Sequence, residues 1–287
     1  MKDFTIQTYK KLLIALHQQG FLFQHFKDFQ STIENQKRII LRHDIDACKD
    51  NSIQFAKMEY KVGIVGTYYF RIVPKSFNEK IIKEIAELGH EIGYHYEVMD
   101  TCQGDIEKAY TEFCRNLELF RKLVPVVTAC MHGSPISKYD NRAIWRKYDY
   151  KKLGISAEPY FDVDFSEVLY LTDTGRRWDG GAVNIRDKGL GIRNEGLGVE
   201  VYGDWKVKPV SGSLMSMSQR SIDFQNKFQF RSTQNIIKAA QKGNLPDKTM
   251  MTFHPQRWTD KPLPWARELV WQNVKNVGKY FIVKIRD

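Results

Sequence analysis

The chain has 287 residues, of which 42% are hydrophobic, 27% charged and 13% aromatic. These values are typical of a globular protein with a substantial buried core, and they exclude disorder as the main state. The four cysteines show no CxxC spacing, so a small disulfide-stapled domain is excluded and free thiols are expected.

The charge balance favours an anionic partner. Forty-four Lys and Arg residues against 34 Asp and Glu residues give a net charge of +10. No run of five or more basic residues occurs, so we expect a phosphorylated small substrate or an anionic lipid surface rather than nucleic acid. No stretch approaches the ~20 apolar residues of a membrane span, and the first residues lack a signal-peptide pattern. We therefore expect a cytoplasmic protein, for which peripheral membrane contact stays open.

The predicted elements begin with an amphipathic helix within residues 5–29 that ends near Gly20. A short apolar strand over residues 38–45 follows and leads into charged residues. Further strands are predicted over residues 66–73, 91–96, 126–132, 154–157, 168–171 and 249–253, and further helices over residues 77–88, 105–123 and 264–277.

This alternation indicates an α/β fold in which crossover helices connect parallel strands. About seven mainly parallel strands predict a distorted (β/α) barrel preceded by the N-terminal helix, as a single domain over residues 1–287. An open doubly wound sheet is the alternative, but the chain has neither G-x-G-x-x-G after the first strand nor a P-loop. Residues 180–230 are rich in Gly, Ser, Arg and Met without periodicity, which predicts an irregular insertion.

Polar side chains collect where the predicted strands end. They are His43, Asp44, Asp46, His95, Glu97, His132 and His254. In a parallel barrel these ends share one face, where active sites of such folds lie. Alternate residues of an extended segment point the same way, so both aspartates can enter one pocket. Carboxylates together with imidazoles suit a divalent metal, Zn²⁺ or another first-row ion.

Four segments, RHDID, GTYYF, GHEIGYH and TFHPQ, occur in this order over about residues 38–258. Together they resemble the motif set of the polysaccharide deacetylase family, the NodB homology domain of carbohydrate esterase family 4. Its members have a distorted (β/α) barrel and remove N-acetyl or O-acetyl groups from sugars with a bound divalent metal. The resemblance implies that Asp44 is the general base, Asp46 and His95 are metal ligands, and His254 protonates the leaving group. It also implies a structural role for His90.

Two departures from the family pattern place this chain in a divergent branch, similar to proteins of O-antigen and surface polysaccharide biosynthesis. Met99 stands where the family has its second metal histidine, and MHGSP replaces the family's Arg-Pro-Pro-Tyr segment. Glu97, Asp100 and His132 are the candidate replacements for the missing ligand. We favour His132 because it ends a neighbouring strand.

Four further residues are predicted to contact the substrate: Arg42, Arg177, Trp178 and Arg257. We expect Trp178 to stack on a sugar and the arginines to bind a phosphate or carboxylate. Arg42 or Arg177 is also expected to keep Asp44 ionised, since an adjacent guanidinium lowers the pKa of a carboxyl group.

The favoured hypothesis is a metal-dependent hydrolase that removes an acetyl or related acyl group from an amino sugar, carried on a nucleotide or lipid phosphate. Two alternatives stay open. One is a sugar-binding protein whose metal site has decayed at Met99. The other is a hydrolase of a different non-peptide C–N bond, such as a formamide.

Overall fold

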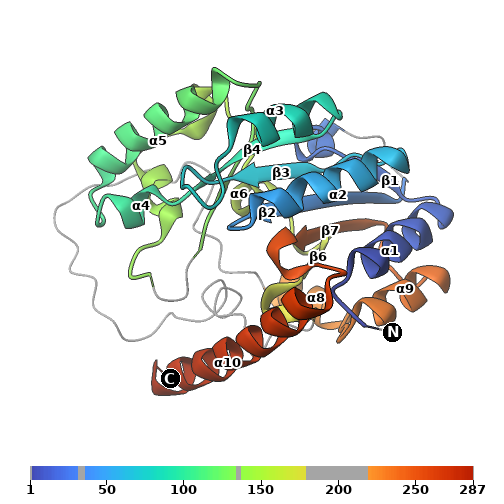
Figure 1. The fold of residues 1–287 in the computed structure, drawn as a ribbon. Coiled ribbons are helices and arrows are strands. Elements are labelled where there is room, and N and C mark those ends of the chain that lie inside the picture. Colours follow the sequence, from blue (N-terminus) through green and yellow to red (C-terminus); the bar gives the residue numbers. More distant parts are fainter. Residues whose placement is uncertain (1, 32–35, 134–136, 179–218, 287) are drawn as a thin grey trace.

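The computed structural model describes residues 2–31, 36–133, 137–178 and 219–286 (Figure 1). Most of the predicted irregular insertion, residues 180–218, lies outside the described residues. Its last part does not follow the prediction, because Gln219–Asn226 forms helix α8.

Seven parallel strands form one sheet in the order β5-β4-β3-β2-β7-β6, with β1 also paired to β2. They are β1 (Leu22–Gln24), β2 (Arg38–Ile45), β3 (Thr67–Phe70), β4 (Glu91–Tyr96), β5 (Ala129–Met131), β6 (Leu169–Thr172) and β7 (Lys248–Phe253). This arrangement confirms the predicted α/β fold with a distorted barrel of about seven parallel strands. The barrel is open, since β5 and β6 are not paired with each other in the described part of the chain.

Helices cover the sheet and follow most of its strands (Figure 1). Apart from α8 they are α1 (Ile6–Gln18), α2 (Lys49–Lys61), α3 (Glu79–Glu87), α4 (Val98–Thr101), α5 (Ile106–Arg121), α6 (Pro159–Asp162), α9 (Thr233–Gln241) and α10 (Pro262–Arg286). The side chains of Thr5, Asn78 and Asp105 cap α1, α3 and α5 by accepting a backbone N–H of the first turn. Each such cap stabilises its helix by about 1 kcal/mol. None of the described helices is both long and apolar enough to cross a bilayer.

The structure has elements that were not predicted, among them helix α9, and α10 extends beyond the predicted residues 264–277. Helix α2 was not predicted, because it buries only four residues and two of them, Ser52 and Glu59, are polar. Residues 154–157 form no strand, since only Ala157 pairs with the sheet, through an isolated bridge to Thr128. Leu22–Gln24, just after the end of the predicted first helix, forms the short strand β1, which was not predicted.

A buried polar cluster joins α1 and α2 to the sheet. Glu59 of α2 receives hydrogen bonds from the hydroxyls of Tyr9 (2.5 Å) and Tyr68 (2.8 Å) and lies 2.8 Å from Nε2 of His43. All four side chains are fully buried. Burial alone raises the pKa of Glu59, but His43, His90 and the hydrogen bonds outweigh it and lower this pKa below its usual value.

Replacing Glu59 with Gln is expected to lower the free energy of unfolding by about 2–4 kcal/mol at pH 7, because a buried ion pair and its hydrogen bonds are disrupted. The pKa of Glu59 is depressed in the folded state, so its contribution is present above the unfolded pKa of about 4.5 and is lost as the pH falls through the folded pKa. Urea unfolding at several pH values should show the difference between variant and wild type shrinking below this pH.

Glu84→Gln is the matched control. Glu84 pairs with Lys57 on the surface, so its loss is expected to change stability by less than about 1 kcal/mol. Equal effects of the two substitutions would show that the Glu59 cluster does not stabilise the packing of α2.

Candidate metal centre

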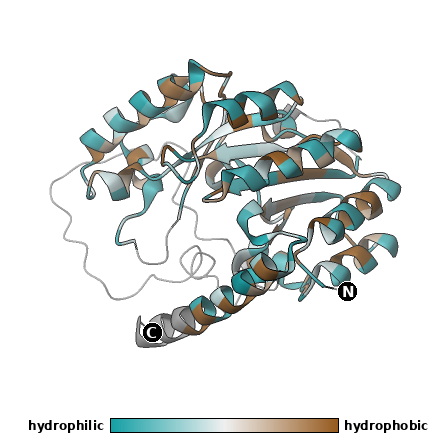
Figure 2. Ribbon diagram, in the orientation of Figure 1, coloured by the Kyte–Doolittle hydropathy of each residue, from teal (hydrophilic) through white to brown (hydrophobic). Residues whose placement is uncertain are grey.

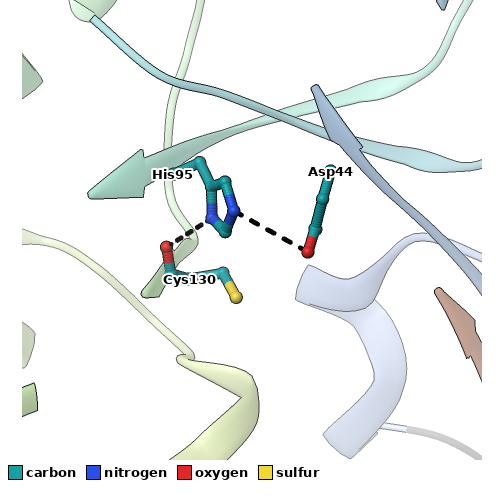
Figure 3. A group of neighbouring side chains, drawn as sticks. All are labelled: Asp44, His95 and Cys130. Atoms are coloured by element: carbon teal, nitrogen blue, oxygen red, sulfur yellow. Dashed lines mark hydrogen bonds and ion pairs between the residues drawn. The ribbon is translucent and has the colours of Figure 1, made fainter. Parts of the chain in front are cut away.

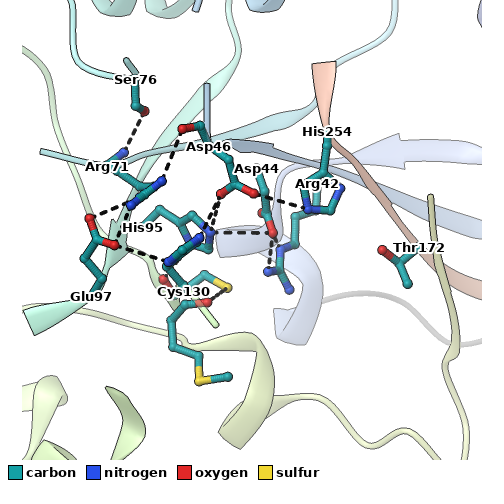
Figure 4. A network of polar contacts seen from close by, with 12 residues as sticks. Arg42, Asp44, Asp46, Arg71, Ser76, His95, Glu97, Cys130, Thr172 and His254 are labelled. Carbon is teal, nitrogen blue, oxygen red and sulfur yellow. Dashed lines mark hydrogen bonds and ion pairs between the residues drawn. The ribbon is translucent and has the colours of Figure 1, made fainter. Parts of the chain in front are cut away.

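The predicted site residues meet at the carboxyl ends of the parallel strands (Figure 4). Asp44 lies in β2 and Asp46 directly after it, His95 lies in β4, and His132 and His254 follow β5 and β7. Asp46 is the centre of the group, because its carboxylate faces all three histidines at 3.4–3.7 Å. Residues far apart in sequence therefore share one site, as the strand-end pattern predicts.

Three potential metal-ligand atoms, one carboxylate oxygen and two imidazole nitrogens, lie close together. Oδ1 of Asp46 lies 3.5 Å from Nε2 of His95 and 3.4 Å from Nε2 of His132, and the three side chains form a group with metal-binding spacing. Oδ1 of Asp46 and Nε2 of His95 are buried and have no hydrogen-bond partner among the described residues. A zinc ion with ligands at about 2.0–2.1 Å in a tetrahedron separates ligand atoms by about 3.3 Å. The spacing of this trio therefore fits a small divalent metal.

The other ring nitrogen of each histidine is also consistent with metal binding. Nδ1 of His95 lies 2.9 Å from the backbone oxygen of Cys130. A carbonyl only accepts hydrogen bonds, so the proton is on Nδ1 and the Nε2 lone pair faces Asp46. Nδ1 of His132 lies 3.3 Å from Glu97, which Arg71 holds through two hydrogen bonds. Such outer partners typically orient metal-binding imidazoles.

A second group with metal-binding spacing consists of Asp44, His95 and Cys130 (Figure 3). It fits a metal less well than the first. Both carboxylate oxygens of Asp44 already accept hydrogen bonds from Arg42, at 2.8 and 2.7 Å. Its charge is thus compensated, whereas Asp46 faces only imidazoles. We therefore assign the candidate metal site to Asp46, His95 and His132.

Asp44 is a buried carboxylate held in its ionised form. Burial raises its pKa, but the charges of Arg42 and His95 and the hydrogen bonds from Arg42 outweigh burial, so the net pKa is well below its usual range. Arg42 or Arg177 was expected to keep Asp44 ionised, and in the structure Arg42 is the arginine that bonds to Asp44. Its guanidinium is buried against the rings of Tyr69 and Tyr160, so it contacts Asp44 and not solvent.

His254 belongs to a buried pair with Asp173. Its Nδ1 lies 2.6 Å from Oδ1 of Asp173, and its backbone N–H donates to Oδ2. Arg257 and the Trp258 indole N–H also donate to this carboxylate. Burial raises the pKa of Asp173, but His254 and Arg257 lower it overall. With Nδ1 bonded to a carboxylate, Nε2 of His254 points toward Oδ2 of Asp46 at 3.7 Å.

Asp173 and Arg71 were not predicted as parts of this site. A signal for Asp173 is present in the sequence, since it directly follows a predicted strand. β6 and β7 pair in register, with Thr172 opposite Thr252, so Asp173 and His254 emerge side by side. Arg71 follows β3 in the same way and reaches the site through Glu97.

Of the four predicted substrate contacts, Trp178 is buried in the core, and Arg42 and Arg257 are hydrogen-bonded to aspartates. Trp178 is 4% exposed, packs against Phe4 and Phe253, and donates its indole N–H to Thr233. Arg257 is bonded to Asp173 and Arg42 to Asp44, so each orients another side chain. Arg177 is half-buried directly after the 3₁₀ turn η4 (Thr174–Arg176).

Residues near the missing family histidine have structural contacts. Met99 is buried in α4, where its backbone N–H donates to Asn141. Asp100 accepts a hydrogen bond from the same asparagine, and Glu97 contacts His132. Of the candidate replacements, only His132 groups with Asp46 and His95 at metal-binding spacing in the described chain.

Solvent reaches the site from one side. The side chains of Asp44, His95 and His254 are at most 4% exposed, whereas those of Asp46, His132 and Glu97 are 13–21% exposed. Asp46, His132 and Glu97 are therefore the members of the group that solvent reaches, whereas Asp44, His95 and His254 are buried.

No protein-family model matches the chain, and no curated protein matches it significantly. Among solved structures, it is similar to a mutant of the peptidoglycan deacetylase PdaC from Bacillus subtilis, with 10% sequence identity and a TM-score of 0.36. The match covers 86% of this chain and 98% of that one. So distant a likeness carries no functional argument.

The metal-free protein is expected to bind one equivalent of Zn²⁺, and His132→Ala is expected to weaken binding at least about 100-fold, because losing a ligand costs more than losing an outer partner. A competition titration against a chelator measures both. His17→Ala, at an exposed position of α1, is the control and should bind as the wild type does. Unchanged affinity in His132→Ala would remove His132 from the ligand set.

Proposed function

We propose that this protein is a metal-dependent hydrolase that removes an acetyl or related acyl group from an amino sugar or glycan intermediate of surface polysaccharide biosynthesis. The observation that carries the proposal is the grouping of the Asp46, His95 and His132 trio with two further side chains: the Asp44 carboxylate lies 3.7 Å from His95, and the His254 imidazole lies 3.7 Å from Asp46. Hydrolysis of an amide or ester needs an electrophilic centre, a base and an acid on the same site.

Two histidines and one carboxylate suit Zn²⁺ with an open position for substrate or water. Bound there, a divalent ion supplies Lewis acidity that polarises an acyl carbonyl and acidifies water. Asp46 contributes negative charge, and the Glu97 and Cys130 contacts fix the two rings. The remaining steps are carried out by side chains of the chain itself.

Asp44 is proposed to accept the proton of the attacking water. Its carboxylate is 3.7 Å from Nε2 of His95, on the inner side of the trio. Arg42 holds it in one orientation through two hydrogen bonds and keeps it ionised. The same contact makes Asp44 a weak base, so it releases the proton to water once the leaving group, protonated by His254, has departed, and His254 takes up a proton from water in turn.

His254 is proposed to give a proton from Nε2 to the departing sugar amine or alcohol. Asp173 supports this role because it fixes the ring through Nδ1, so that Nε2 faces the site. The arrangement resembles the carboxylate–histidine pairs of other hydrolases, in which the carboxylate orients the imidazole.

The sugar substrate rests on the resemblance of the four motifs to the deacetylase family, and a nucleotide or lipid phosphate carrier rests on the net charge of +10. The alternative of a decayed metal site receives less support. His132 groups with Asp46 and His95 at metal-binding spacing although Met99 offers no hard ligand, and the buried Oδ1 of Asp46 and Nε2 of His95 have no hydrogen-bond partner among the described residues.

Asp44→Asn is expected to lower kcat for an N-acetyl amino sugar by about 10²–10⁴-fold, because a neutral amide cannot accept the proton. Its affinity for Zn²⁺ should stay close to that of the wild type, since Asp44 is not in the trio. Acetate release from a panel of N-acyl sugars and sugar nucleotides measures the activity, with the exposed Asp50→Asn as control. Full activity in Asp44→Asn would reject the base assignment, and an inactive zinc-loaded wild type on the whole panel would reject the proposed substrate class.

Asp173 and His254 are expected to act as one unit. Asp173→Asn and His254→Ala should each lower kcat, whereas the double variant should be no worse than His254→Ala alone, because Asp173 acts only through the imidazole. A double-mutant cycle on kcat, with zinc content measured for each variant, tests this. Additive losses would show that Asp173 has an effect independent of His254.

A further inference from the structure

The C-terminal helix α10 has its polar side toward the protein. Gln272 is buried and bonds to Glu268 at 2.6 Å, and Asn276 donates to the backbone oxygen of Gly175 at 3.0 Å. These three residues follow one another at intervals of four, so they form one face of the helix. This face contacts η4, the turn that directly follows Asp173.

The opposite face of α10 is apolar and exposed. Its five large hydrophobic side chains are 53–83% exposed; they are Leu263, Val270, Trp271, Val274 and Val277. At 100° per residue they fall within an arc of about 120° on the side away from Gln272. A surface helix normally buries its apolar stripe and exposes its polar one, so α10 has the reverse pattern. Figure 2 shows the apolar residues recurring along α10, which extends away from the body of the protein.

Basic residues border this apolar face. Arg267 is exposed within the arc, and the Lys275 ammonium lies 5.0 Å from the ring centre of Trp271 at its edge. Residues 262–286 contain five basic residues and one acidic residue, and the whole chain carries +10. Two copies of such a surface repel each other, whereas an anionic surface attracts it. Aliphatic and Trp side chains flanked by Lys and Arg are typical of helices that lie in the interface of a bilayer.

We propose that the exposed face of α10 binds the surface of a membrane that contains anionic lipids, with the helix parallel to the bilayer. The apolar side chains enter the boundary between headgroups and acyl chains, and Arg267 and Lys275 contact lipid phosphates. Because α10 begins eight residues after His254 and packs on the turn after Asp173, the bilayer lies beside the segments that carry the candidate site. This inference goes beyond the proposed hydrolysis and does not depend on it.

The test is co-sedimentation of the full chain with vesicles, without any sugar substrate. Vesicles of phosphatidylcholine with phosphatidylglycerol at a ratio of 3:1 should bind the protein, and added salt should weaken the binding. Vesicles of phosphatidylcholine alone should bind it far less. Val270→Ser with Val274→Ser should reduce binding to the mixed vesicles at least about tenfold, since two apolar side chains no longer transfer out of water.

Tyr60→Ser is the matched control, because Tyr60 is an exposed apolar residue of α2; it should bind as the wild type does. Lys275→Glu is a second variant that leaves the apolar side chains in place and should weaken binding to the mixed vesicles only. Absence of vesicle binding, equal binding to both lipid mixtures, or a dimer in sedimentation velocity that the two serine substitutions abolish would each overturn the proposal. The last result would assign the face to a second copy of this chain.

Discussion

The candidate site depends on one electrostatic constraint, the convergence of carboxylate and imidazole ligand atoms on a point where the described residues offer no hydrogen-bond donor. Oδ1 of Asp46 and Nε2 of His95 are buried without partners, and the His95 tautomer is fixed by a backbone carbonyl that can only accept. Burying such atoms without a partner is costly in free energy. A cation satisfies them together, which makes metal binding the simplest physical reason for this arrangement.

The rest of the fold holds these atoms in place. All seven strands are parallel, so their carboxyl ends lie at one edge, and the side chains come from the ends of β2, β4, β5 and β7 or from the residues just after them. The Glu59 cluster fixes the opposite side of β2 through His43, the residue between Arg42 and Asp44. Rigid strands with supported side chains hold ligand positions more precisely than loops do. Each of three site side chains is oriented by an outer partner: Arg42 contacts Asp44, Glu97 contacts His132, and Asp173 contacts His254.

Much of this could be predicted from the sequence, for reasons that can be stated. Strands such as Arg38–Ile45 are short apolar runs followed by charged residues, and their order fixes which side chains share an edge. Helix α2 escaped prediction because half of its buried residues are polar, and the role of Asp173 depends on the pairing of β6 with β7, which local sequence does not specify. Trp178 was predicted as a sugar platform because aromatic residues near a site often serve so, but it fills the core beside Phe253. Whether an aromatic ring packs or is exposed depends on tertiary structure.

X-ray absorption spectroscopy of the zinc-loaded protein tests the central claim most directly, because it reports the atoms bound to the ion. The account predicts nitrogen and oxygen neighbours at about 2.0–2.1 Å, with the outer-shell scattering of two imidazoles. A sulfur neighbour at about 2.3 Å would place the ion on Cys130 with Asp44 and His95 instead, and scattering without imidazole would remove the site altogether.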